Sequence, residues 1–219
     1  MLIITNFKTY ETALGTEAIK LAKIHEEVSK IEPDTAFGVA PSALDLENIC
    51  MECPGISVFA QHVDDAGLGS ATGKIPPVFV KKLGATGTIL NHSENRLSRE
   101  YLEKCIKRAK EAGLKVIVCA ETAEEGESFL EFDPDFIAIE PPELIGGDIS
   151  VSTANPELIK DAVKRIGSNK VIVGAGVKNA EDVRIAKKLG ASGILLASGV
   201  TKAKDPRAVL IDLASGAKA

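Results

Sequence analysis

Eight apolar segments of strand length recur along the chain, and a stretch that can form a helix follows each of them. The apolar segments are continuous, as in parallel strands that helices cover, and no low-complexity linker separates them. Closing eight parallel strands into a barrel leaves no strand edge unpaired. The sequence therefore predicts an α/β fold, a single (β/α)8 barrel in which residues 1–219 form one domain.

The strand segments are rich in Val, Ile, Leu and Ala and are bounded by turn-forming residues. The sixth segment stops at Glu140, because Pro141 and Pro142 fix φ and cannot extend a strand ladder. The expected strands span residues 2–4, 35–40, 56–61, 86–90, 114–119, 135–139, 171–173 and 193–196.

The helix segments carry apolar residues at helical spacing, and several of them end at a glycine. Ser42 is expected to cap the second helix, and Pro76 to lie in the first turn of the third. The helix after the fifth strand is short, so the outer helices of the barrel are expected to be shortened. The expected helices span residues 17–30, 42–51, 76–83, 98–112, 123–130, 156–166, 180–189 and 206–213.

An open, doubly wound sheet is the alternative fold. Such a sheet normally carries a Gly-x-Gly-x-x-Gly turn after an early strand, and no such turn follows the first three expected strands. This difference favours the closed barrel.

The composition limits the function classes. Of the 219 residues, 45% are hydrophobic and 26% are charged, and the net charge of −5 comes with scattered Lys and Arg. We therefore expect no nucleic-acid partner and no membrane surface. The N-terminus lacks a signal segment and no apolar run has the length of a membrane span, which predicts a cytoplasmic protein. Cys50 and Cys53 have no second ligand pair for zinc, so free thiols and no metal are expected.

Polar side chains follow several of the expected strands. Asn6 and Lys8 follow the first strand, His92 follows the fourth and Glu140 follows the sixth. All of them lie at carboxyl ends, the face where barrel enzymes place their sites. The other two histidines, His25 on a charged helix face and His62 in a loop, are interpreted as structural or solvated.

Small residues follow the last two strands: Gly-Ala-Gly at 174–176 and Ala-Ser-Gly at 197–199. Such turns let backbone N–H groups approach an anion closely, and nearby helix N-termini add positive potential. The pair predicts a phosphate site. Residues 141–147 have a stiff proline entry and a glycine exit, as a lid over a site requires.

Taken in order, these motifs resemble those of the triosephosphate isomerases, in the shorter form found in archaea, and the resemblance covers all eight units. The motifs are Asn6-Phe7-Lys8, Asn91-His92-Ser93-Glu94, Glu140-Pro141-Pro142-Glu143-Leu144-Ile145-Gly146, Gly174-Ala175-Gly176 and Leu196-Ala197-Ser198-Gly199. The chain departs from the family at Asn91, where many members have Gly, and at the lid entry and exit, which bears on lid kinetics rather than on the reaction.

The resemblance implies a glycolytic and gluconeogenic isomerase that interconverts dihydroxyacetone phosphate and glyceraldehyde 3-phosphate without a cofactor. It implies that Glu140 is the catalytic base, that His92 is the electrophile, and that Lys8 and Asn6 bind the substrate. It also implies a set of residues whose backbone binds the phosphate: Ile145, Gly146, Gly174, Gly176, Ala197 and Ser198.

The resemblance further implies self-association, because the family's loop that matches residues 62–73 inserts into a neighbouring subunit. Shortened helices would leave an apolar patch for a second interface, so a homotetramer is expected over a homodimer. Two other functions stay open. One is a different sugar-phosphate isomerase or epimerase on the same barrel, and the other is a non-catalytic phosphate-binding barrel.

Overall fold

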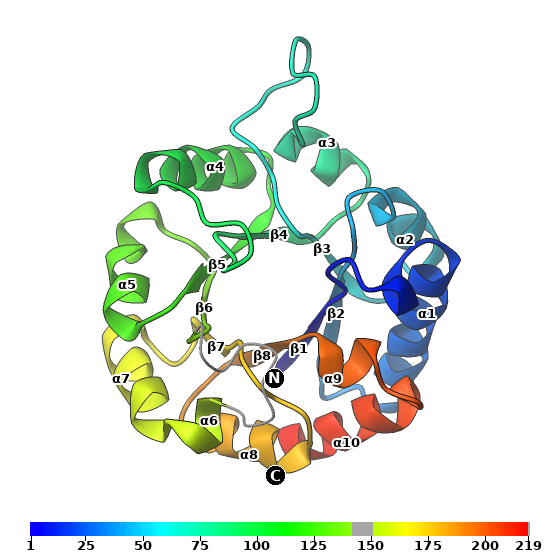
Figure 1. Cartoon of the computed structure of the whole chain (residues 1–219), viewed down its shortest axis with the longest axis vertical. Coiled ribbons are helices and arrows are strands. Elements are labelled where there is room, and N and C mark those ends of the chain that lie inside the picture. The colour runs from blue at the N-terminus through cyan, green and yellow to red at the C-terminus, as the bar shows by residue number, and fades with distance from the viewer. Residues whose placement is uncertain (142–150, 219) are drawn as a thin grey trace.

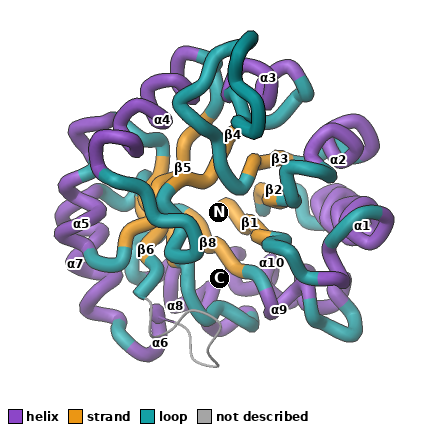
Figure 2. Tube along the Cα trace, turned by 45° about the horizontal axis from the view of Figure 1, so that its top comes forward, coloured by secondary structure: helices purple, strands orange, loops and turns teal. Residues whose placement is uncertain are grey.

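The computed structural model describes residues 1–141 and 151–218. Eight parallel strands pair in sequence order, and the ring closes where β1 pairs with β8. Figures 1 and 2 show the strands as an inner ring and the helices as an outer ring. The closed ring confirms the predicted (β/α)8 barrel and excludes the open sheet. The strands are β1 (Leu2–Asn6), β2 (Ala36–Ala40), β3 (Ser57–Ala60), β4 (Gly87–Leu90), β5 (Lys115–Ala120), β6 (Phe136–Ile139), β7 (Val171–Val173) and β8 (Gly193–Leu196).

The outer helices differ greatly in length. The long ones are α1 (Thr16–Ile31), α4 (Arg99–Glu111), α7 (Pro156–Ile166), α8 (Ala180–Lys188) and α10 (Pro206–Lys218). The short ones are α2 (Leu46–Glu52), α3 (Pro77–Lys82), α5 (Ala123–Ser128), α6 (Val151–Ala154), α9 (Ser198–Thr201) and the 3₁₀ turns η1 (Glu11–Ala13) and η2 (Leu130–Phe132). The six-residue α5 agrees with the predicted shortening after the fifth strand.

Apolar side chains form two layers of core. The inner layer fills the barrel and includes Ile4, Phe59, Ile89 and Ile172, all of which are almost fully buried. The outer layer lies between the strands and the helices. Both faces of every strand are therefore buried, which explains why the strand segments are continuous apolar runs rather than alternating ones.

Two helix boundaries were predicted wrongly. The helix α2 begins at Leu46 rather than at Ser42, whose hydroxyl instead accepts from the backbone N–H of Leu44 at 3.3 Å. The helix α10 continues through Gly216, whereas we expected it to end near Leu213. A Cβ at Gly216 would clash with the backbone of Ala180, so this glycine allows α10 to pack closely on the start of α8.

One loop extends beyond the ring of helices: residues 61–76, between β3 and α3, project outward in Figure 1. Asp64 fixes the base of this loop, since its carboxylate accepts from the backbone N–H of Ile75 at 2.7 Å and from the hydroxyl of Tyr101 at 3.0 Å. These bonds join both sides of the loop to α4. Among the described residues, no helix is both long and apolar enough to cross a membrane.

Candidate active site

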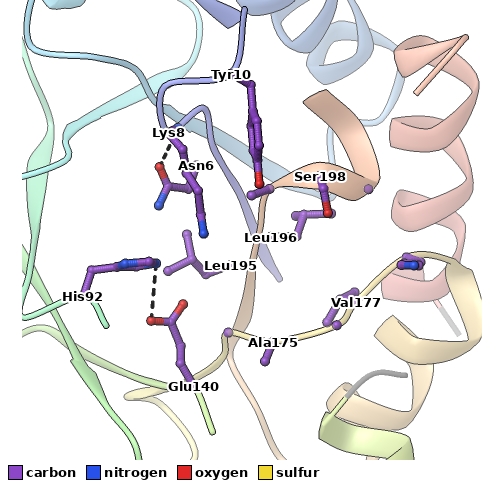
Figure 3. A pocket seen from close by; sticks show the side chains of 15 residues that line it. Asn6, Lys8, Tyr10, His92, Glu140, Ala175, Val177, Leu195, Leu196 and Ser198 are labelled. Carbon is purple, nitrogen blue, oxygen red and sulfur yellow. Dashed lines mark hydrogen bonds and ion pairs between the residues drawn. The ribbon is translucent and has the colours of Figure 1, made fainter. Parts of the chain in front are cut away.

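One pocket lies at the carboxyl ends of the strands, and Asn6, Lys8, His92 and Glu140 line it together. Figure 3 shows these four side chains pointing toward a common space from β1, from the loop after β4 and from the end of β6. The turns after β7 and β8 form the opposite wall. The structure thus brings together the described residues that the sequence singled out, whereas Ile145 and Gly146 lie outside the described residues.

Glu140 follows β6 directly, and its backbone N–H donates to the carbonyl of Ala120 at 2.8 Å. Its side chain is buried, and Oε2 has no hydrogen-bond partner among the described residues. Burial raises the pKa of Glu140 to about 7, while the thiol of Cys119 and the charge of Lys8 act in the opposite direction. A carboxylate with a free oxygen and a pKa near neutrality is suited to act as a general base.

His92 is buried as well, and its two ring nitrogens have different surroundings. The backbone N–H of Glu94 donates to Nδ1 at 3.1 Å, so the proton of the neutral ring lies on Nε2. Nε2 is 3.7 Å from Oε2 of Glu140, across the pocket. Burial lowers the pKa of His92, and the positive charge of Lys8 lowers it further. The imidazole is therefore neutral near pH 7 and presents an N–H donor to the pocket.

Lys8 follows the end of β1 and brings a positive charge to the pocket. Its Nζ forms an ion pair with Oε1 of Glu94 at 2.7 Å. Its backbone is left-handed, with φ of 47°, and two side chains hold it there. Asn6 accepts from the N–H of Lys8 at 3.0 Å, and Gln61 donates to its carbonyl at 3.0 Å. An unfavourable backbone conformation held by neighbours is common at functional sites.

The two small-residue turns differ in what they offer an anion. Gly176 has φ of 70°, a conformation that only glycine adopts easily. Ser198 begins the short helix α9, and Ala197, Ser198 and Gly199 line the pocket. The N–H of Gly174, in contrast, already donates to the carbonyl of Ile139 at 3.0 Å. A Cβ at Gly174 would clash with Glu140, so this glycine makes room for the carboxylate.

Several residues of the site were not predicted from the sequence. Tyr10 lines the pocket, and Nζ of Lys202 lies 4.6 Å from the centre of its ring. Gln61 could have been found, because it ends an expected strand as the other polar residues do. The thiol of Cys119 lies against Glu140, and Cys119 carries no motif that would have signalled this.

The other predicted features lie outside the pocket. All four cysteines, Cys50 and Cys53 included, are free. In the described part of the chain, no three His, Cys, Asp or Glu side chains gather as they would around a metal ion. His25 is not on a charged face: it is fully buried, and Nε2 is 2.8 Å from the hydroxyl oxygen of Thr5.

A buried carboxylate, a neutral imidazole, a lysine and two turns of small residues thus line one pocket at one end of a closed parallel barrel. This fold and this pocket are typical of (β/α)8-barrel enzymes, whose active sites lie at the carboxyl ends of the strands. A sequence model described as triosephosphate isomerase matches residues 1–216. The chain belongs to the triosephosphate isomerase family.

Similar proteins named triosephosphate isomerase come from several archaea. That of Methanocaldococcus jannaschii is 44% identical over 190 residues, which are 85% of this chain and 86% of the relative. That of Methanosarcina mazei is 43% identical over 215 residues, 96% of each chain. That of Metallosphaera sedula is 39% identical over 219 residues, 99% of this chain and 95% of the relative.

Proposed function

We propose that the protein is an isomerase that interconverts dihydroxyacetone phosphate and D-glyceraldehyde 3-phosphate. The observation that carries this proposal is the buried Oε2 of Glu140, unpaired among the described residues and 3.7 Å from Nε2 of a neutral His92. A proton must leave a carbon atom next to the carbonyl and return to the neighbouring carbon. A carboxylate of raised pKa can take and return it.

Each side chain has a role in this proposal. Glu140 removes the proton, and the electron pair moves onto the carbonyl oxygen to form an enediolate. The hydroxyl proton then moves from one enediolate oxygen to the other beside His92, before Glu140 returns its proton to the neighbouring carbon. The Nε2–H group of His92 donates to the developing oxyanion, and the charge of Lys8 stabilises it. Asn6 holds the backbone of Lys8 in place. No cofactor takes part in these steps.

The phosphate binds at the opposite wall in this proposal. The N–H groups of Gly176 and of the turn formed by Ala197 and Ser198 donate to its oxygens. The N–H of Gly174 is used by Ile139, so we assign Gly174 to the space beside Glu140 rather than to the phosphate. The predicted contacts of Ile145 and Gly146 remain part of the proposal.

We also propose a cytoplasmic homotetramer. Self-association goes with the family, and several large apolar side chains are exposed, with Leu44 at 91%, Met51 at 72% and Leu68 at 61%. Leu68 belongs to the projecting loop 61–76, and Leu44 to the connection between β2 and α2. Exposed apolar groups on projecting loops suit an interface between copies of the chain.

A coupled assay with glyceraldehyde 3-phosphate tests the proposed reaction, since a dehydrogenase specific for the ketose product reports turnover. The isomerase predicts turnover with triose phosphates and none with pentose phosphates. Turnover of a pentose phosphate alone would favour a sugar-phosphate epimerase. Binding of phosphate compounds without any turnover would favour a non-catalytic barrel.

A further inference from the structure

Asn91, the residue before His92, has a backbone conformation that is rare for residues other than glycine. Its φ is 60°, in the left-handed region, and its side chain is almost fully buried. Asn enters this region more readily than other residues with a Cβ. The chain turns here from β4 into the loop of residues 92–97.

Both ends of the Asn91 amide are used. Nδ2 donates to the carbonyl of Cys119 at 3.0 Å, and Oδ1 accepts from the backbone N–H of Leu97 at 3.0 Å. The first bond fixes the beginning of the loop to the end of β5. The second bond joins the beginning of the same loop to its end. One side chain therefore closes the loop that carries His92.

The end of β5 also fixes Glu140. The carbonyl of Cys119 accepts from Asn91, and the carbonyl of the next residue, Ala120, accepts from the backbone N–H of Glu140 at 2.8 Å. Asn91, the neighbour of His92, and Glu140 thus donate to two successive carbonyl groups of one strand. The side chains of His92 and Glu140 are 3.7 Å apart, which is too far for a hydrogen bond to hold them in place.

We propose that Asn91 is a positioning residue: its amide fixes the His92 loop to the end of β5 and thereby sets Nε2 of His92 opposite Oε2 of Glu140. The inference rests on the proposed isomerase function, in which the substrate lies between these two atoms. A displacement of about 1 Å at a catalytic group can cost about a hundredfold in rate. The amide of Asn91 would therefore act on turnover without touching the substrate.

Two substitutions separate the amide from the backbone conformation. Asn91→Gly keeps the left-handed conformation and removes both hydrogen bonds, whereas Asn91→Ala removes them and adds backbone strain. We expect kcat to fall at least about tenfold in Asn91→Gly and further in Asn91→Ala. The inhibition constant of inorganic phosphate should stay within about twofold of the parent's, because the phosphate turns lie on the opposite wall.

Asn155→Gly is the matched control. Asn155 accepts from the N–H of Leu158 at 3.2 Å at the start of α7, outside the pocket. Its loss should lower the melting temperature only slightly, because glycine is tolerated at a helix N-cap, and leave kcat unchanged. If Asn91→Gly also loses only thermal stability and keeps kcat within about twofold of the parent, Asn91 has a purely structural role and the proposal is wrong.

A parent protein without isomerase activity would refute the proposed function rather than this inference. Crystal structures of the parent and of Asn91→Gly then test the positioning role, through the distance between Nε2 of His92 and Oε2 of Glu140. The positioning role predicts that this distance changes clearly on substitution. An unchanged distance and an unchanged His92 ring orientation would overturn the proposal.

Discussion

Burial makes the carboxylate of Glu140 costly to ionise, and it also makes the ionised carboxylate more basic. The buried carboxylate is costly to ionise, and this cost raises the pKa of Glu140 from 4.5 to about 7. A base with an ordinary pKa would be ionised at neutral pH but would be a weaker proton acceptor. The raised pKa leaves about half of Glu140 ionised near pH 7 and makes the ionised form more basic.

The pH dependence of kcat/KM follows from this pKa. Glu140 must be ionised to accept a proton, so we expect kcat/KM to rise roughly tenfold between pH 6 and pH 8. Burial and the charge of Lys8 lower the pKa of His92, so protonation of His92 contributes less to this rise than that of an ordinary histidine would. The measurement is an initial-rate profile with glyceraldehyde 3-phosphate.

Glyceraldehyde is the control substrate for this profile, because it has no phosphate group that titrates near pH 6. The same rise with glyceraldehyde would assign the titration to the protein. A profile that is flat from pH 8 down to pH 5 would show that the base has an ordinary carboxyl pKa.

The positions of Glu140, His92 and Lys8 in the site were predictable, because a polar residue just after a buried strand marks the carboxyl end of a barrel. The role of Gly174 in making room for Glu140 was not predictable, because it depends on a contact between the ends of two neighbouring strands. Asn91 differs from the Gly of many family members, which the sequence shows, but its two hydrogen bonds are made to Leu97 and Cys119. Sequence alone does not place those partners.

Among the elements, the connection after β7 carries the clearest steric requirement. Gly176 lines the pocket with φ of 70°, and a larger residue there would be strained and would obstruct the backbone N–H groups of the turn. We expect Gly176→Val to raise KM for glyceraldehyde 3-phosphate by tenfold or more, with a smaller effect on kcat.

Gly113→Val is the control for the backbone strain that any residue with a Cβ meets at a positive φ. Gly113 has φ of 77° after α4, and the nearest atom to an added Cβ would be Cε of Lys81 at 3.8 Å. This variant should lose stability and keep its KM. If Gly176→Val keeps the KM of the parent, the phosphate does not bind at the turn after β7.

His25 of α1 contacts Thr5 of β1, and this buried histidine makes the free energy of unfolding depend on pH. Burial lowers the pKa of His25 to about 4, whereas an unfolded histidine has an ordinary pKa near 6.5. At His25 the unfolded chain therefore binds more protons below pH 6.5, and the contribution of His25 to stability is lost as the pH falls from 6.5 toward 4. Between pH 7.5 and pH 5 the loss from His25 is about 2 kcal/mol.

His25→Leu removes this titration while keeping an apolar side chain in the core. Urea denaturation of parent and variant at pH 7.5 and pH 5 measures the effect. The parent should lose about 2 kcal/mol more than the variant between the two pH values. An equal loss in both proteins would mean that another group causes the acid sensitivity.

Element boundaries were less predictable than element order. The strand order followed from the continuous apolar runs, but the beginning of α2 did not. Asp45 precedes α2, and its carboxylate accepts from the backbone N–H of Gly15 at 3.1 Å instead of capping the helix. The four-residue α9 also went unpredicted, because its sequence reads equally well as a turn.

At the scale of the whole molecule, the projecting loop 61–76 and the short outer helices favour association. We expect a homotetramer, with a mass near four times the 23.1 kDa of one chain. Light scattering at micromolar concentration measures this mass. A mass near two chains would exclude the tetramer, and a fully active monomer would exclude both interfaces.

In the proposed reaction, the barrel places Glu140 beside a triose phosphate as its catalytic base. The most direct test is kcat of Glu140→Gln in the coupled assay with glyceraldehyde 3-phosphate, beside the parent. Gln keeps the shape of the side chain and cannot accept the proton, so we predict a loss of roughly 10² to 10⁴ in kcat while phosphate analogues still bind. A kcat within about threefold of the parent would show that Glu140 is not the base.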